Sequence, residues 1–349
     1  MVSSALPLCA QTANSSLGAS QPLPSAGADS GWTALTAGLT PAQPPSRPTS
    51  MQGLIGQQVA GYEKIRLAAA AFATNYPSDS RASAARKIEV MAEIQEYAIG
   101  GRPYEGPAQT VASAYRQDAS VPVADRFDVA LAFDSVGVAL KPGERLIDDG
   151  AAYRGLADAL HAEFGDQPPV YHFYRQVMDT ADVGTSVTVA KEVLTLNAPD
   201  WAKTTAQQII DRNNLIGKPL NVVLIEYGGR PLDLLATNAR PTLLYFWSNH
   251  PGTAQLSQLS PYLLSVPKNT RIVYVCLMAD MSATAIAAGE AAAPLPGQFC
   301  FQASGLWTAE ETGIGLQQLP YVYALDPRGV LVGYGRPEDI PNLMSAAIK

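Results

Sequence analysis

The sequence predicts an all-α domain followed by a C-terminal α/β domain, and three observations support this prediction. Between residues 51 and 214, Ala-rich segments carry apolar residues at helical spacing. After Gly217 the pattern changes to strand-length runs that are almost continuously apolar, which is typical of a sheet covered on both faces. Residues 14–50 are rich in Ser, Ala, Gly, Pro and Thr, which predicts a disordered linker. The expected domains are residues 1–50, 51–214 and 215–349.

Composition and charge argue against several classes of function. The chain has 349 residues, of which 47% are hydrophobic, enough for two folded units. Its formal net charge of -7 and the lack of a long basic run argue against binding to nucleic acid. Because no run of apolar residues is long enough to span a bilayer, we expect no transmembrane helix. Cys9, Cys276 and Cys300 are too scattered for a zinc site or a disulfide framework.

The first residues resemble the end of a secretory signal. An apolar stretch at residues 5–8 is followed by small residues at Ala10 and Ala13, although the usual basic residues before it are missing. We expect residues 1–13 to be a signal-peptide remnant and the protein to be exported to the bacterial periplasm or envelope; a cytoplasmic location is the alternative. A lipid anchor on Cys9 is disfavoured because Leu8 stands where a small residue is needed.

Turn and capping signals divide the helical region into several helices. Apolar residues between Ile65 and Phe72, and between Ile88 and Tyr97, mark two helices on either side of a turn at residues 76–79. Short connections favour helical hairpins, and hence a bundle or a short solenoid, but no fixed repeat period decides between them. The further helices are expected at residues 108–117, 123–140, 151–164, 169–179, 186–194 and 201–212.

Strands are expected at the C-terminal end of the chain. Apolar runs of strand length lie at residues 222–225, 242–246 and 272–277. Two further runs, at residues 321–325 and 330–334, flank an Asp-Pro-Arg-Gly turn and predict a β-hairpin. Residues 337–348 are expected to form a closing helix.

Four phrases of this region resemble a known family. Residues 217–220 (GKPL), 229–234 (GRPLDL), 241–248 (PTLLYFWS) and 319–329 (LPYVYALDPRG) follow the order found in redoxin-type thioredoxin domains. These are the TlpA-type thiol reductases of the bacterial envelope and the related alkyl hydroperoxide reductase/thiol-specific antioxidant group. The resemblance implies a central mixed sheet flanked by helices, with Pro320 as the family's cis-proline.

The chain departs from this family at the residues that carry its chemistry. The family places a Cys-x-x-Cys shortly after Phe-Trp, because a thiolate at a helix N-terminus has a lowered pKa and a second thiol resolves the mixed disulfide. Here Pro251 and Ala254 stand at the two cysteine positions. We therefore expect a degenerate site with no catalytic residue, no cofactor and no metal ion, and an activity other than Cys-x-x-Cys thiol–disulfide exchange.

Other thiols and histidines offer weaker alternatives. Cys276 is expected to be a buried strand residue, whereas Cys300, between two Phe residues, is the candidate for a lone reactive thiol. If their strands are neighbours, a Cys276–Cys300 disulfide is conceivable. His250 has no nucleophile or carboxylate near it in sequence, and His161 and His172 form no metal pair.

The favoured hypothesis is a redox-inactive thioredoxin-like protein with a binding or scaffolding role. The resemblance implies that Trp247, Asn249, His250 and Pro320 line a groove for a protein or an extended peptide. One alternative is a thiol-dependent oxidoreductase or peroxidase that uses Cys300. Another places the function in the helical domain, as a protein-interaction module to which the thioredoxin-like part is a structural appendage.

Overall fold

The described part of the protein comprises two compact units. The structure is a computed structural model that describes residues 26–39, 50–139, 150–220, 222, 224–226, 229–234, 240–247, 259–277, 295–301 and 319–348. One unit ends at Phe133 and the other begins at Asp134. The predicted domain boundary at residue 215 lies inside the second unit. That the residues on its two sides fold separately stays a prediction. No described helix is both long and apolar enough to cross a membrane.

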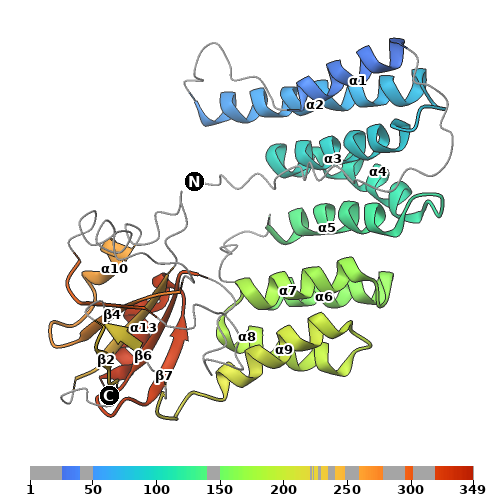
Figure 1. Ribbon diagram of the computed structural model, residues 1–349. Coiled ribbons are helices and arrows are strands. Elements are labelled where there is room, and N and C mark those ends of the chain that lie inside the picture. The colour runs from blue at the N-terminus through green and yellow to red at the C-terminus, as the bar shows by residue number, and fades with distance from the viewer. Residues whose placement is uncertain are drawn as a thin grey trace. The chain divides into compact units, whose positions relative to one another are not determined.

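The first unit consists of helices, and from residue 51 onward the apolar spacing predicts them. Ser50 caps the second of them, because its side chain accepts a hydrogen bond from the Gly53 N–H at 3.1 Å. Gly101, with a φ of 76°, ends the third. The elements are α1 (Ala26–Gly38), α2 (Met51–Asn75), α3 (Ala82–Gly100), the short 3-10 helix η1 (Arg102–Tyr104), α4 (Glu105–Gln117) and α5 (Val123–Ala139), which runs past the limit between the units (Figure 1).

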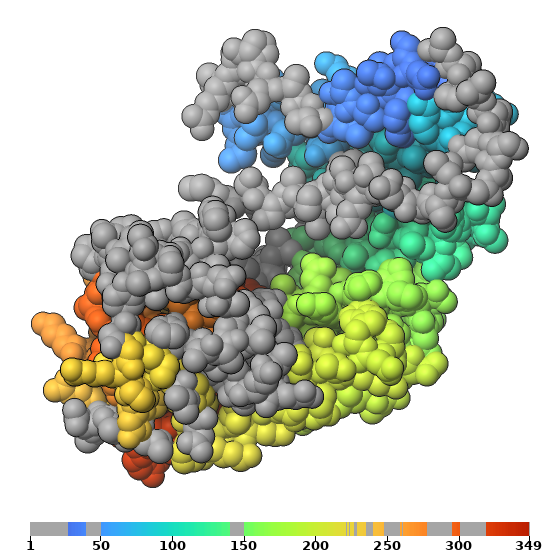
Figure 2. Space-filling model, viewed as in Figure 1, coloured from blue at the N-terminus to red at the C-terminus, as the bar shows by residue number. Residues whose placement is uncertain are grey.

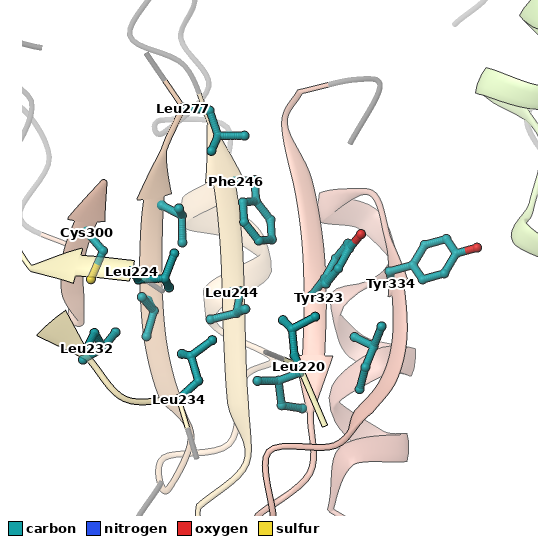
Figure 3. Packing of buried hydrophobic residues seen from close by; sticks show 14 residues of the cluster. Leu220, Leu224, Leu232, Leu234, Leu244, Phe246, Leu277, Cys300, Tyr323 and Tyr334 are labelled. Atoms are coloured by element: carbon teal, nitrogen blue, oxygen red, sulfur yellow. The ribbon is translucent and has the colours of Figure 1, made fainter. Parts of the chain in front are cut away.

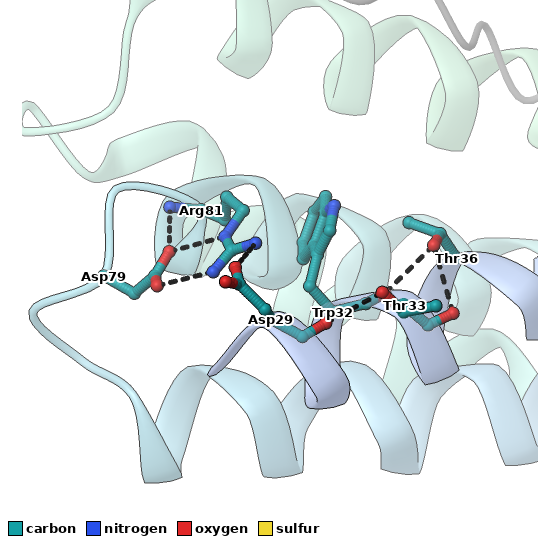
Figure 4. A network of polar contacts seen from close by, with 6 residues as sticks. All are labelled: Asp29, Trp32, Thr33, Thr36, Asp79 and Arg81. Carbon is teal, nitrogen blue, oxygen red and sulfur yellow. Dashed lines mark hydrogen bonds and ion pairs between the residues drawn. The ribbon is translucent and has the colours of Figure 1, made fainter. Parts of the chain in front are cut away.

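Helix α1 corrects the prediction of a linker over residues 14–50. The Trp32 ring meets the Phe72 ring of α2 edge-on, with 5.3 Å between ring centroids, and Leu35 is only 2% exposed. Asp29 forms an ion pair with Arg81 at 2.9 Å (Figure 4). In Figure 2 the atoms of α1 lie against those of α2. The average composition of the segment gives no sign of these contacts. Burial of the apolar side chains in them offsets the entropy that the chain loses when it becomes ordered.

The helical part of the second unit is made of two hairpins with short connections. Asp182 caps its third helix by accepting a hydrogen bond from the Thr185 N–H at 3.0 Å. The His172 ring stacks on Trp201 with 4.6 Å between ring centroids, so this histidine packs one hairpin against the other. The helices are α6 (Gly150–Phe164), α7 (Pro168–Thr180), α8 (Val183–Thr195) and α9 (Asp200–Asn213), close to the predicted ranges.

The rest of the second unit contains a mixed sheet. Its strand order is β2-β1-β5-β4-β3-β6-β7. Strands β3, β4 and β5 run parallel, whereas β6 is antiparallel to β3, and β7 pairs with β6 in the predicted hairpin. The strands are β1 (Leu224–Glu226), β2 (Pro231–Leu232), β3 (Thr242–Trp247), β4 (Arg271–Cys276), β5 (Gln298–Phe301), β6 (Tyr321–Leu325) and β7 (Leu331–Gly335); the described helices beside them are α10 (Ser260–Leu263), η3 (Pro337–Asp339) and α13 (Ile340–Ala347).

Both faces of this sheet are buried, as the continuous apolar runs predict. Alternate residues of β3 enter different cores: Leu244 and Phe246 belong to one, and Tyr245 and Trp247 to the other. Figure 3 shows the first core, in which Phe246 and Leu277 lie at the same end. The second core includes Ile340 and other residues of α13. The predicted α/β class with a central mixed sheet after an all-α region is confirmed.

The segment that joins α9 to the sheet lies along the edge strand β7. The Gly217 N–H donates to the Leu331 carbonyl at 2.8 Å, and the Leu331 N–H donates to the Lys218 carbonyl at 2.9 Å. Pro219 and Val330 form an antiparallel bridge. These bonds pair β7 on its outer side and fix the direction in which the chain leaves α9.

Candidate functional site

The candidate site is one end of the sheet, where three strands bring together residues that are distant in sequence. Strands β3 and β4 end there with Trp247 and Cys276 in register, and the Leu277 N–H donates to the Trp247 carbonyl at 3.0 Å. Strand β6 begins there, since Tyr321 pairs with Phe246. The Leu319–Pro320 peptide bond is cis, as the resemblance implies. We call this end, with Trp247, Leu277 and Pro320, the candidate edge.

Several predicted site residues lie outside the described residues. Asn249 and His250, which the sequence assigns to a groove, and Pro251 and Ala254, which it assigns to the degenerate motif, follow β3 in the chain within residues 248–258. Their roles stay predictions. The amino-acid sequence itself contains no Cys-x-x-Cys.

Trp247 and Pro320 do lie at the candidate edge, but in different environments. Trp247 is 3% exposed and packs in the core beside α13. Its buried indole N–H has no hydrogen-bond partner in the described part of the chain. Pro320 is half-buried. A buried donor without a partner typically costs about 1–3 kcal/mol, so the candidate edge retains a polar group that the described fold does not satisfy.

The two strand cysteines lie on opposite faces of the sheet, which excludes the conceivable Cys276–Cys300 disulfide. Their strands are neighbours, but Cys276 pairs with Phe301 and Cys300 with Val275. This offset of one residue directs the two side chains into different cores. They are not joined, and they are 2% and 3% exposed.

Cys300 has the wrong environment for a reactive thiol. Burial, reinforced by the nearby Glu226 carboxylate and only partly opposed by Arg271, raises the pKa of the Cys300 thiol to about 12. The thiolate is the nucleophilic form, so almost none of it is present at neutral pH. The sequence alone does not show this burial, because only the strand order reveals that β5 lies inside the sheet, between β1 and β4.

An arginine beside the candidate edge is a feature that sequence reasoning missed. Arg212, in the last turn of α9, is 6% exposed. Its guanidinium carbon lies 5.0 Å from the ring centroid of Tyr321 and 5.0 Å from that of Tyr334. Tyr321 directly follows Pro320, so α9 reaches the start of β6. Only the fold brings these residues together, and no motif marks them.

The histidines of the helical part have structural contacts. His161 Nε2 lies 2.9 Å from Asp166 Oδ1, and the Tyr171 hydroxyl donates to the same carboxylate. These contacts tie the end of α6 to the start of α7. Across the described ranges, no group of three or more His, Cys, Asp and Glu side chains is arranged to hold a metal ion.

The strand order decides the fold of the C-terminal part. Parallel β3 and β4, antiparallel β6 and β7, and a cis-proline at the start of β6 are the thioredoxin arrangement. It is a thioredoxin-like fold. The rest of the sheet, β1, β2 and β5, extends it on the other side of β4.

Comparison with solved structures returns thioredoxin-like proteins. The C-terminal domain of a putative thiol-disulfide oxidoreductase from Bacteroides thetaiotaomicron matches at 15% identity and a TM-score of 0.31, over 37% of this chain and 96% of that one. A putative thiol:disulfide interchange protein DsbE from Chlorobium tepidum matches at 20% identity and a TM-score of 0.29, over 38% and 94%. A secreted disulfide oxidoreductase of Mycobacterium tuberculosis matches at 15% identity and a TM-score of 0.29, over 36% and 96%. No protein-family model and no curated protein matches the chain.

Proposed function

We propose that the thioredoxin-like part binds a protein, in the form of an extended segment, and does not exchange thiols and disulfides. The observation that carries the proposal is the position of the two thiols that the structure describes. The sequence has no Cys-x-x-Cys, and Cys276 and Cys300 are buried in two different cores. Catalysis of disulfide exchange needs a reachable thiolate. The part of the expected site that the structure does show is the candidate edge.

Two features of the candidate edge support a binding role. The ends of β3 and β4 and the start of β6 bring Leu277 and Pro320 to the same end of the sheet, with β3 between their strands. Trp247 contributes a buried donor without a partner among the described residues. Asn249 and His250 come shortly after β3 in the chain, and we expect them to add polar side chains to the site. An extended segment recognises such a site through backbone hydrogen bonds and side-chain pockets.

A phage-displayed library of random linear dodecapeptides, panned on the full-length protein, tests this proposal. A selected peptide is then labelled and its dissociation constant measured by fluorescence anisotropy. The proposal predicts saturable binding that weakens about tenfold in the double variant Asn249→Ala, His250→Ala, equal to about 1.4 kcal/mol of binding free energy. Arg175→Ala, an exposed position on α7, is the control. If no peptide is selected, or if the double variant binds as the wild type does, the proposal is wrong.

The alternative is a single redox thiol at Cys300. It requires Cys300 to leave the core before it reacts, because the side chain is 3% exposed and its pKa is raised to about 12. Replacing Cys300 by Ser decides the question: peroxide or mixed-disulfide turnover that the wild type shows and Cys300→Ser lacks would establish this alternative and exclude the proposed function.

The helical hairpins are a second place for a partner to bind. We propose that they form an interaction module, as helical hairpins with short connections often do. Hydrogen exchange of the full-length protein with and without a bound partner separates the two surfaces. Protection confined to α2–α9 would move the binding site from the candidate edge to the helices.

We also propose that the protein is exported to the periplasm or envelope. The support is the apolar stretch at residues 5–8 and the small residues after it. N-terminal sequencing of the mature protein tests this: removal of about the first 13 residues is expected, and an intact first residue would contradict it.

A further inference from the structure

The contact between α9 and the start of β6 involves a buried cation. Arg212 is 6% exposed, and its guanidinium group lies over two tyrosine rings whose centroids are 5.9 Å apart. Burial raises the pKa of Tyr321 to about 12, although the Arg212 cation acts in the opposite direction. Tyr321 is therefore a neutral phenol at physiological pH, and its ring face attracts the cation.

The same contact extends beyond Arg212 to both ends of the α8–α9 hairpin. Val183 at the start of α8 and Leu215 after α9 pack against the core that contains Tyr334. From the sheet side, Arg336 donates a hydrogen bond from Nη2 to the Asp179 carbonyl at 2.7 Å. The hairpin thus contacts the sheet at several points besides Arg212.

The position of Tyr321 in the chain links this contact to the candidate edge. Tyr321 is the first residue of β6, next to Pro320 at the candidate edge, and it pairs with Phe246 of β3. Because the Tyr321 ring is in contact with the Arg212 guanidinium group, the backbone of Tyr321 is less free to move. Lysine would not replace arginine, because its ammonium group lacks the flat guanidinium surface that lies over both rings.

We propose that Arg212 is a positioning residue for the candidate edge, holding the Tyr321 ring and thereby the start of β6, against which the partner segment lies. The proposal rests on the proposed binding function. Preorganisation of this kind strengthens binding because the start of β6 is ordered before the partner arrives. Arg212 itself is buried and would not contact the partner.

The test uses the full-length protein and three variants. Arg212→Met keeps an unbranched apolar side chain without the charge, and Arg212→Lys keeps the charge without the flat guanidinium group. Lys191→Met, at an exposed lysine of α8, is the matched control. All are compared well below the lowest thermal midpoint, so that each protein is folded. Hydrogen exchange of the peptide that contains residues 319–323 is measured without ligand, and the dissociation constant of the selected dodecapeptide by anisotropy.

We expect both Arg212 variants to exchange faster in residues 319–323, with unchanged exchange in β3, and to bind the dodecapeptide about tenfold more weakly. Lys191→Met should match the wild type in both measurements. Unchanged exchange, or faster exchange with unchanged affinity, would overturn the proposal and leave Arg212 as a packing residue. If the wild type binds no peptide, the proposed function is wrong, and so is the role of Arg212 in binding. The exchange measurement then still reports separately whether Arg212 holds Tyr321.

Discussion

At the scale of single residues, burial limits the reactivity of the two thiols that the structure describes. Cys276 and Cys300 stand on neighbouring strands, yet the register of β4 and β5 buries them in opposite cores. Neither is exposed by more than 3%. A thiol in such a position behaves as a small apolar side chain, and reaction with a bulky reagent requires the sheet to open.

We predict that Cys300 alkylates slowly in the native protein and rapidly after denaturation. Because burial raises its pKa to about 12, the thiolate fraction in the folded state keeps rising with pH up to that value. The native rate should therefore climb without a plateau between pH 7 and about 10, where an unperturbed thiol levels off above its pKa of about 8.5. Mass spectrometry of the iodoacetamide-labelled peptides measures the rate at Cys300, with Cys276 as the internal comparison. A plateau near pH 8 would contradict the buried position.

Residue patterns predicted some of these positions and missed others for a physical reason. The burial of Cys276 in a strand is predictable from a local signal, because this residue follows a run of apolar residues. Cys300 also lies in a strand, but only the sheet order shows that this strand, β5, is internal. Arg212 and Tyr334 meet because α9 packs on the sheet. A contact between residues so distant in sequence leaves no local pattern.

At the scale of secondary-structure elements, long periodic segments were predictable and short ones were not. Helices α2 to α9 and strands β3, β4, β6 and β7 follow apolar spacing that extends over several residues. Strand β2 and helix α10 have two and four residues, too few to show a period. Helix α1 was mistaken for a linker because most of its residues are small or polar, and its stability comes from packing against α2.

We predict that Trp32→Ala releases α1 from α2 and lowers the free energy of unfolding by about 1–2 kcal/mol, because it removes the ring contact with Phe72 and with the Arg81 cation. Chemical denaturation measures the loss, and hydrogen exchange of residues 26–38 locates it. Thr33→Ala, at an exposed position of the same helix, is the control and should change little. Fast exchange of α1 in the wild type would contradict its packing.

The β6–β7 hairpin should lose stability in acid through Asp326. Burial alone would raise the pKa of this carboxyl, but hydrogen bonds from the Val330 N–H and from Arg328 outweigh it and lower the pKa below its ordinary value. A lowered folded-state pKa stabilises the protein above the unfolded-state pKa, and this contribution disappears as the pH falls through the folded-state value.

The measurement is urea denaturation at pH 7 and at about pH 3, below the ordinary Asp pKa of about 3.9. We expect Asp326→Asn to be less stable than the wild type at pH 7 and to lose less stability on acidification. Asp211→Asn, at an exposed position of α9, is the control. An equal acid sensitivity of Asp326→Asn and the wild type would show that the turn carboxylate does not contribute.

At the scale of the whole molecule, the thioredoxin-like fold and the hairpins before it share one compact unit. Arg212, Val183 and Leu215 pack against the sheet, and Arg336 is bonded back to α7. The change from helical to strand periodicity after Gly217 marks a change of secondary structure, and it predicted the fold class correctly. A change of period does not report which elements pack together, because packing depends on surfaces that only the folded chain brings into contact.

We predict that a fragment of residues 215–349 is markedly less stable than a fragment of residues 134–349. The shorter fragment lacks Arg212 and the α8–α9 hairpin, so the rings of Tyr321 and Tyr334 lose their cover. Thermal unfolding followed by circular dichroism compares the two fragments. Equal thermal midpoints would show that residue 215 is the limit of an independently folding domain, as the sequence suggests.

The central claim, that this thioredoxin-like protein does not exchange thiols and disulfides, is tested most directly by insulin reduction with dithiothreitol. We predict that the full-length wild type adds nothing to the rate of dithiothreitol alone. The double variant Pro251→Cys, Ala254→Cys, which restores a Cys-x-x-Cys at the predicted positions, should accelerate the reaction. Turnover by the unaltered chain at a rate comparable to that of the double variant would contradict the account.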